Sequence, residues 1–246
     1  MDDVSYHRLL AEFYKRCNYA MVFRSALDDV AATVDFSHVK SCVAFGTGSG
    51  EREIKFARRL LPNLRSFAAV EPDTESVEAL QASFQNGELP GVETSVVQTL
   101  LQSWSGVDNH VDAVLLFNML IYVNNEDRKA LFENLMTRHL SHGSIVAIAN
   151  TVTSVPSGYT LLMERLGKPR IDYDELEKEI VSAGFRVVFK QDLIVRRALP
   201  NADDDDVKFI QLLTGRSASE VRTAIGDIFS QPNMDMYVNK LAVFTK

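Results

Sequence analysis

The stretch SCVAFGTGSGE, residues 41–51, decides the fold of this chain. A short, mostly apolar run leads into three glycines, Gly46, Gly48 and Gly50, with one residue between each pair. Glycine adopts left-handed backbone conformations without steric cost and lets the backbone approach a ligand closely. The pattern therefore predicts a buried strand that ends in a ligand-binding turn and continues into a helix.

The spacing of these glycines distinguishes two classes of cofactor. A dinucleotide site carries G-x-G-x-x-G/A, whereas here the third glycine comes one position early. Glu51 would also place a carboxylate near the pyrophosphate, which is unfavourable. S-adenosylmethionine (SAM) has no phosphate and carries a cationic ammonium and sulfonium, so it tolerates a nearby acid. The loop favours SAM over NAD.

A second acid supports this interpretation. Glu71 follows Gly50 by 21 residues and stands at the expected end of the second strand, in AAVEPD (68–73). A carboxylate there can accept two hydrogen bonds from ribose hydroxyls. This feature alone fits NAD as well as SAM, and only together with the loop does it indicate SAM.

Apolar runs alternate with amphipathic ones along most of the chain. We expect strands near 40–46, 64–71, 91–98, 110–118 and 143–150, and helices near 51–61, 73–85 and 125–140. Strands that are apolar on both faces are typical of a parallel sheet covered by helices. Repeated βα units of this kind predict a doubly wound α/β domain.

Two segments interrupt this alternation. Residues 1–38 are expected to form two N-terminal helices, and residues 151–171 insert a short helix after the fifth strand. Loops that follow strand ends surround the ligand crevice in such sheets. Segment 151–171 is therefore a candidate substrate cover, with an ordinary connection as the alternative. We find no repeat and no linker, and expect one domain over 1–246.

Composition and charge exclude several functions. The chain has 26 basic and 33 acidic residues and a net charge of −7, which argues against nucleic acid or an anionic membrane as partner. Its most apolar run, 111–123, is too short to span a bilayer. Cys17 and Cys42 lack metal-site spacing and suggest a reduced protein, which we expect to be cytoplasmic. The acidic run 203–206 is expected to begin a helix, where acids favour the dipole, so we expect no metal.

Two motifs resemble those of the class I SAM-dependent methyltransferases. VAFGTGSGE (43–51) looks like their first motif and AVEPD (69–73) like their second. The resemblance implies a Rossmann-like, mostly parallel seven-stranded sheet whose last strand is antiparallel, and 237–244 suits that strand. No prolines follow Asn118, which argues against methylation of base or protein amide nitrogens.

Four further stretches resemble the histamine N-methyltransferase group. They are YHRLLAEFYKRC (6–17), NMLIYV (118–123), SGYTLLMERLG (157–167) and VNKLAVF (238–244). The resemblance implies methylation of a nitrogen in a small-molecule amine, with SAM as cofactor, by a monomer.

The same resemblance implies roles for individual residues. The cofactor would be bound by Gly46, Gly48, Gly50, Glu71, Ser76, Gln98, Thr99 and Phe117. The acceptor would be bound by Tyr6, Phe13, Asn18, Tyr19, Asn118, Tyr122, Tyr159, Met163, Arg170, Leu212 and Asn239. Asn118 and Tyr122 would orient the acceptor, and we assign no general base.

The acceptor residues depart from the group's pattern. A glutamate that receives the amine of histamine is matched here by Tyr19, beside Asn18, and an aromatic residue is replaced by Arg170. A lost anion and a gained cation suit an acceptor that carries a carboxylate, unless Arg170 faces solvent. Methyl transfer to oxygen or sulfur, and a catalytically silent SAM-fold binding protein, are the alternative functions.

Overall fold

The structure is a computed structural model. It describes residues 6–104, 110–152, 155–168, 171–196, 202–231 and 234–246, with the backbone alone at residues 6 and 7. These residues form two compact units. The sheet unit consists of residues 26–150, 175–191 and 241–246, and the helical unit of residues 1–25, 151–174 and 192–240.

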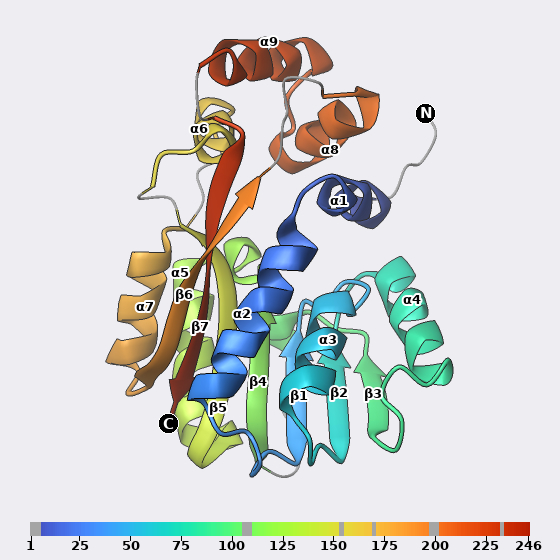
Figure 1. Cartoon of the computed structure of the whole chain (residues 1–246), viewed down its shortest axis with the longest axis vertical. Coiled ribbons are helices and arrows are strands. Elements are labelled where there is room, and N and C mark those ends of the chain that lie inside the picture. Colours follow the sequence, from blue (N-terminus) through green and yellow to red (C-terminus); the bar gives the residue numbers. More distant parts are fainter. Residues whose placement is uncertain (1–5, 105–109, 153–154, 169–170, 197–201, 232–233) are drawn as a thin grey trace. The chain divides into compact units, whose positions relative to one another are not determined.

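A seven-stranded sheet has the strand order β3-β2-β1-β4-β5-β7-β6 (Figure 1). In chain order the strands are β1 (Ser41–Phe45), β2 (Ser66–Val70), β3 (Glu93–Val97), β4 (Val111–Phe117), β5 (Leu140–Val152), β6 (Arg186–Arg196) and β7 (Met236–Thr245). The pairs β1–β2, β1–β4, β2–β3 and β4–β5 are all parallel. The end of β7 is antiparallel to β5, because Gly143 N donates to Lys246 O and Lys246 N donates to Ser144 O. The predicted doubly wound, mostly parallel sheet is confirmed.

Helices follow β1, β2 and β4, as the alternation predicted. The helix bounds are α1 (Tyr6–Lys15), α2 (Tyr19–Thr33), α3 (Glu51–Leu60), α4 (Thr74–Gln85), α5 (Asn125–Asn134), α6 (Gly158–Arg165), α7 (Tyr173–Ser182), α8 (Asp204–Thr214) and α9 (Ala218–Phe229). Short helical turns are η1 (Leu101–Ser103), η2 (Leu120–Tyr122) and the π-helical η3 (Leu135–His139). Asp73 caps α4 by accepting from Ser76 N at 2.8 Å. No described helix is long and apolar enough to cross a membrane.

The expected start of the fifth strand was wrong. The sequence suggested a turn before Gly143, but β5 begins at Leu140. Val111 pairs with Leu140 and Ala113 with Ile145, so β5 contains extra residues that bulge out of the ladder. Gly143 lies within this stretch and has a φ of +84°, a left-handed conformation that glycine adopts without steric cost. A bulge places turn-forming residues inside a strand, which the pattern alone could not reveal.

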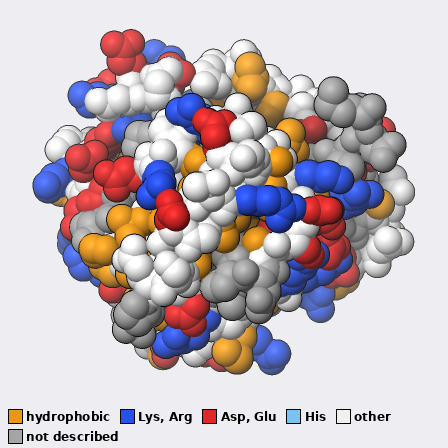
Figure 2. Space-filling view, turned by 90° about the horizontal axis from the view of Figure 1, so that it is seen from above, with side chains coloured by type: hydrophobic (Ala, Val, Ile, Leu, Met, Phe, Trp, Pro, Cys, Tyr) orange, Lys and Arg blue, Asp and Glu red, His pale blue; other side chains and the backbone are white. Residues whose placement is uncertain are grey.

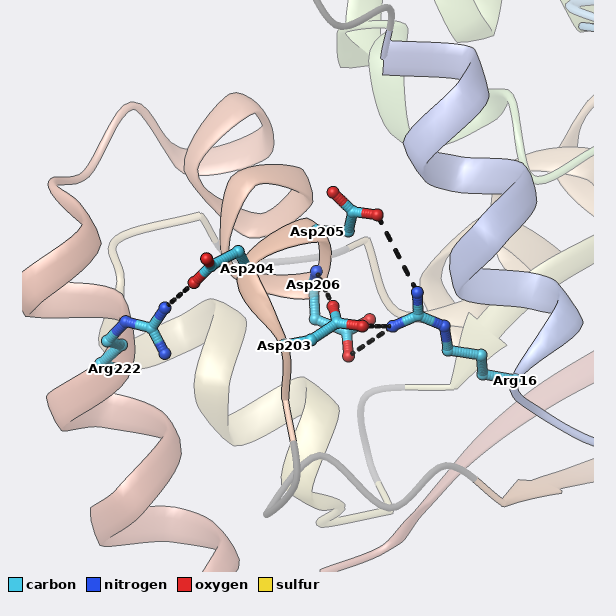
Figure 3. A network of polar contacts seen from close by, with 6 residues as sticks. All are labelled: Arg16, Asp203, Asp204, Asp205, Asp206 and Arg222. Atoms are coloured by element: carbon cyan, nitrogen blue, oxygen red, sulfur yellow. Dashed lines mark hydrogen bonds and ion pairs between the residues drawn. The ribbon is translucent and has the colours of Figure 1, made fainter.

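The acidic run 203–206 begins α8, as expected, and holds it to neighbouring helices of the helical unit. Figure 3 shows the Arg16 guanidinium facing three of its carboxylates, those of Asp203, Asp205 and Asp206. Asp203 also caps the helix by accepting from Asp206 N at 3.0 Å, and Arg222 of α9 pairs with Asp204. Acidic and basic side chains likewise lie side by side on the face shown in Figure 2. Within the described residues, no group of three or more acidic, histidine or cysteine side chains is arranged to hold a metal ion.

Candidate active site

The glycine loop requires glycine both for its backbone conformation and for space. Gly46, Gly48 and Gly50 all have positive φ, at +58°, +53° and +76°. A Cβ on Gly46 would lie 2.6 Å from the Cβ of Met119, and one on Gly50 would overlap Leu80. The loop is therefore packed tightly against Met119, which follows β4, and against Leu80 of α4.

Glu71 ties this loop to the end of β2. Its side chain is buried, and Oε2 accepts a hydrogen bond from Gly48 N at 2.8 Å. Oε1 accepts from Asp73 N at 3.1 Å. A carboxylate has about four lone-pair sites, so both oxygens keep capacity for further donors such as ribose hydroxyls. The two backbone bonds fix the position of the carboxylate beside the loop.

The next helix, α4, carries a buried hydroxyl without a hydrogen-bond partner, that of Ser76. The residue is buried in the first turn of α4, and its Oγ has no hydrogen-bond partner. A buried hydroxyl without a partner is unfavourable unless a ligand or water satisfies it. The unused lone pairs of Glu71 and the unsatisfied Ser76 hydroxyl are what a polar cofactor with hydroxyl groups would complete, so the residues present fit SAM.

The remaining residues expected at the cofactor lie at the ends of β3 and β4. Gln98 is exposed, and its Nε2 donates to Thr74 Oγ1 at 2.8 Å, which links the end of β3 to the start of α4. Thr99 is half-buried beside it. The Phe117 ring is buried and packs against Phe56 of α3, with centroids 5.5 Å apart.

Asn118 has an unusual backbone conformation directly after β4. Its φ is +56°, and it is the one non-glycine residue with positive φ in the part of the chain that the structure describes. Its N donates to Ala149 O of β5 at 2.7 Å, which holds this conformation. Strained residues of this kind are concentrated at functional sites. Tyr122, four residues later at the end of η2, is 59% exposed.

The helical unit contains a continuous group of rings, here called the aromatic cluster. Phe13 lies 5.9 Å from Tyr159, and Tyr159 lies 5.3 Å from Tyr237, measured between ring centroids. Tyr14 lies 5.1 Å from Tyr19 and 6.0 Å from Phe13. The full cluster is Phe13, Tyr14, Tyr19, Phe23, Tyr159, Phe209 and Tyr237. Tyr237 was not predicted from the sequence, although the alternation of the final strand places it on the same face as Asn239.

Other residues expected at the acceptor differ in their surroundings. Asn239 is buried, and its Oδ1 has no hydrogen-bond partner. Met163 is fully buried on α6, whereas Leu212 on α8 is 55% exposed. Asn18 accepts a hydrogen bond from Arg196 N at 2.7 Å through Oδ1. Arg170 and the side chain of Tyr6 lie outside the described residues.

Glu53 is a buried acid that sequence reasoning did not single out. It lies in the first turn of α3, is 1% exposed, and neither carboxylate oxygen has a hydrogen-bond partner. Burial raises the pKa of Glu53 to about 7, opposed by Arg52 and reinforced by the nearby charges of Glu71 and Glu51. Most charged residues of this helix are exposed, among them Glu51, Lys55 and Arg58, whereas Glu53 faces inward.

Comparisons with known proteins agree with this geometry. Residues 43–143 match the family model described as a methyltransferase domain, and this range holds every residue expected to bind the cofactor. No protein of established function shows significant sequence similarity to the chain. Several hundred solved structures resemble it.

Three of these structures illustrate the kinds of methyltransferase that share this fold. A putative methyltransferase from Bacillus halodurans is 13% identical, with a TM-score of 0.66 over 90% of this chain and 97% of that one. A putative sarcosine dimethylglycine methyltransferase from Galdieria sulphuraria is 10% identical, with a TM-score of 0.60 over 92% and 86%. A magnesium protoporphyrin methyltransferase from Synechocystis, solved with bound S-adenosylhomocysteine (SAH), is 11% identical, with a TM-score of 0.58 over 93% and 85%. At these identities the likeness establishes the fold, and the proteins differ in the acceptors for which they are named.

Proposed function

We propose that this chain is a SAM-dependent methyltransferase that moves the methyl group to a nitrogen of a small molecule. The acceptor is a histamine-like amine or heterocycle, and an acceptor that carries a carboxylate is the first variant to consider. SAM is the cofactor, and the residues around Gly48, Glu71 and Ser76 would hold it.

One observation carries this proposal. Phe13 and Tyr159 come from two separate segments that resemble the histamine N-methyltransferase group, and both lie in the aromatic cluster of the helical unit, which also contains Tyr19. An aromatic lining excludes water and can hold a cationic group against ring faces, worth about 0.5–2 kcal/mol. Such a lining suits a small amine or heterocycle better than a polymer backbone.

The chemistry that these residues must support is an in-line displacement. When bound, SAM supplies a methyl group activated by its sulfonium. The nitrogen lone pair of the acceptor would form the new N–C bond, the C–S bond would break with its electrons left on sulfur, and a proton would leave the nitrogen for solvent. The chain must hold a neutral nitrogen in line, and orientation of this kind can contribute roughly 7–11 kcal/mol. Asn118, held in its strained conformation, and Tyr122 are our candidates for this positioning.

Other parts of the proposal rest on the sequence. We propose that 151–171, which includes α6, covers the acceptor, and that the chain acts as a single domain. A monomeric state and a cytoplasmic location stay predictions. The preference for a carboxylate depends on Arg170, which lies outside the described residues.

Histamine and histidine form a matched pair for the test, because they differ by one carboxylate. The protein is incubated with isotopically labelled SAM and each amine, and products are identified by mass spectrometry. Label on a nitrogen of either compound supports the proposal. Preference for histidine that disappears in Arg170→Ala supports the carboxylate hypothesis, and unchanged selectivity in that variant contradicts it.

The alternatives are separated in the same assay. Tyramine offers a phenolic oxygen beside its amine, so label on oxygen would favour an O-methyltransferase. A folded protein that binds SAH, measured by calorimetry, and methylates none of the three compounds would contradict the proposed function and favour a silent binding protein or another acceptor atom.

A further inference from the structure

Tyr237 is a buried phenol inside the aromatic cluster, and the proposed function assigns it no role. It is 4% exposed, and its ring packs against Tyr159. Burial raises the pKa of Tyr237 well above its ordinary value, and the neighbouring Tyr14, Cys17 and Tyr19 raise it further. The hydroxyl therefore keeps its proton at any physiological pH, so it is a potential hydrogen-bond donor and not a general base.

Asn239 shares a face of β7 with Tyr237. Side chains two apart on a strand point to the same side and are separated by roughly 7 Å along it. The neighbour Lys240 points to the other side, where its Nζ lies 4.9 Å from the Tyr173 ring centroid and 3.2 Å from Asp192 Oδ1. The charge on this part of β7 is thus held away from the face that carries Tyr237 and Asn239.

The Asn239 side chain leaves one polar atom unsatisfied. The residue is 1% exposed, and its Oδ1 accepts no hydrogen bond. A buried acceptor without a donor is costly, and in native proteins such an atom usually has a ligand or water as its partner. The face of β7 therefore presents one acceptor in need of a donor and, two residues earlier, one phenol that remains protonated.

We infer that Tyr237 and Asn239 together bind an uncharged polar group of the methyl acceptor, one that offers both an N–H donor and an oxygen acceptor, as a primary carboxamide does. The Asn239 Oδ1 would accept from the N–H, and the Tyr237 hydroxyl would donate to the oxygen. This group is distinct from the nitrogen that is methylated, whose lone pair must stay free. The inference rests on the proposed function, because it takes the aromatic cluster as part of the acceptor site.

Three pyridines of similar size provide matched probes. Nicotinamide offers both the donor and the acceptor, 3-acetylpyridine offers the acceptor alone, and 3-methylpyridine offers neither. Affinity is measured by calorimetry with SAH-saturated protein, in which no methyl transfer occurs. We expect nicotinamide to bind most tightly and 3-methylpyridine most weakly, with about a two- to tenfold loss for each missing hydrogen bond. Equal affinities, or no binding of any probe, would overturn the inference without any variant.

Two variants assign each bond to its residue. Tyr237→Phe should weaken nicotinamide and 3-acetylpyridine about two- to tenfold. Asn239→Ala should weaken nicotinamide by a similar factor and leave 3-acetylpyridine unchanged, because that probe has no N–H to offer. Tyr173→Phe is the matched control, since it removes a buried phenol from the other side of β7 and should change neither affinity.

These outcomes are separate from those of the methylation assay. The inference is overturned, even if amines are methylated, if Tyr237→Phe binds nicotinamide as tightly as wild type does. It is also overturned if Asn239→Ala loses affinity for nicotinamide and 3-acetylpyridine equally. Probe affinities that follow the expected order, together with no methylation of any amine, would support the binding pair and overturn the proposed function. Melting temperature and SAH affinity establish that each variant is folded.

Discussion

Replacing Glu53 with glutamine is expected to remove the decrease in the free energy of unfolding that ionisation of this buried acid causes as the pH rises. Glu53 is 1% exposed and has no hydrogen-bond partner for either oxygen. Its charged form therefore loses hydration without gaining a side-chain hydrogen bond in exchange. Glu71 lies close enough to add repulsion, and Arg52 offsets part of the cost. The protein consequently holds a proton on Glu53 at pH values where an unfolded chain has released it.

The magnitude follows from the two pKa values. The pKa of Glu53 is about 7 in the folded protein, against an ordinary value of 4.5. Below pH 4.5 both states are protonated and the group costs nothing. Between pH 4.5 and 7 the unfolded state loses its proton first, so stability falls by about 1.36 kcal/mol per pH unit. Above pH 7 both states are ionised, and the accumulated loss is about 3 kcal/mol.

The assay is urea unfolding followed by circular dichroism, at several pH values from 4 to 8.5. We expect the free energy of unfolding of Glu53→Gln, relative to wild type, to rise by about 3 kcal/mol across this range. Contributions from histidines cancel in the difference. Glu51→Gln is the control, because Glu51 lies in the same turn with 69% of its side chain exposed and should give a flat difference. Parallel profiles for wild type and Glu53→Gln would refute the reasoning.

Two further substitutions test the sheet unit. Glu71→Gln should lower SAH affinity, measured by calorimetry, about 10- to 100-fold. The substitution removes a charged acceptor that Gly48 N and Asp73 N hold in place. Unchanged affinity would exclude Glu71 from the cofactor site. Arg128→Ala should destabilise the protein by about 3–5 kcal/mol in urea unfolding, because it leaves the largely buried Glu179 carboxylate without its guanidinium partner. The Arg128 Nη2 and Nε atoms donate to this carboxylate at 2.7 and 2.9 Å. A loss below 1 kcal/mol would show that the pair is solvated.

Much of the fold could be predicted because local signals and tertiary structure agree. The glycines after β1 and the acid after β2 are defined by backbone conformation and by charge, both of which act over a few residues. The start of β5 could not be predicted, because a bulge depends on the register between two strands. Neither α7 nor α9 was predicted, although Ser217 and Glu220 form a capping box at the start of α9 that could have revealed it.

Site residues could be predicted from the sequence where the residue type alone determines the chemical role. Glycine at a turn and glutamate after a strand each permit few alternatives. Glu53 and Tyr237 were missed for the opposite reason, since a glutamate on a charged helix and a tyrosine on a strand usually have ordinary roles. Their significance arises from burial, which depends on how a whole layer packs over them.

Both residues illustrate how burial changes the chemistry of an ionisable side chain. Burial raises the pKa of the Glu53 carboxyl into the neutral range and raises the pKa of the Tyr237 phenol beyond it. The carboxyl therefore exchanges its proton near neutral pH and couples stability to pH, whereas the phenol stays protonated there and is available as a hydrogen-bond donor. Burial thus gives the Glu53 carboxyl, beside the glycine loop, and the Tyr237 hydroxyl, near the unsatisfied Asn239, different chemical roles.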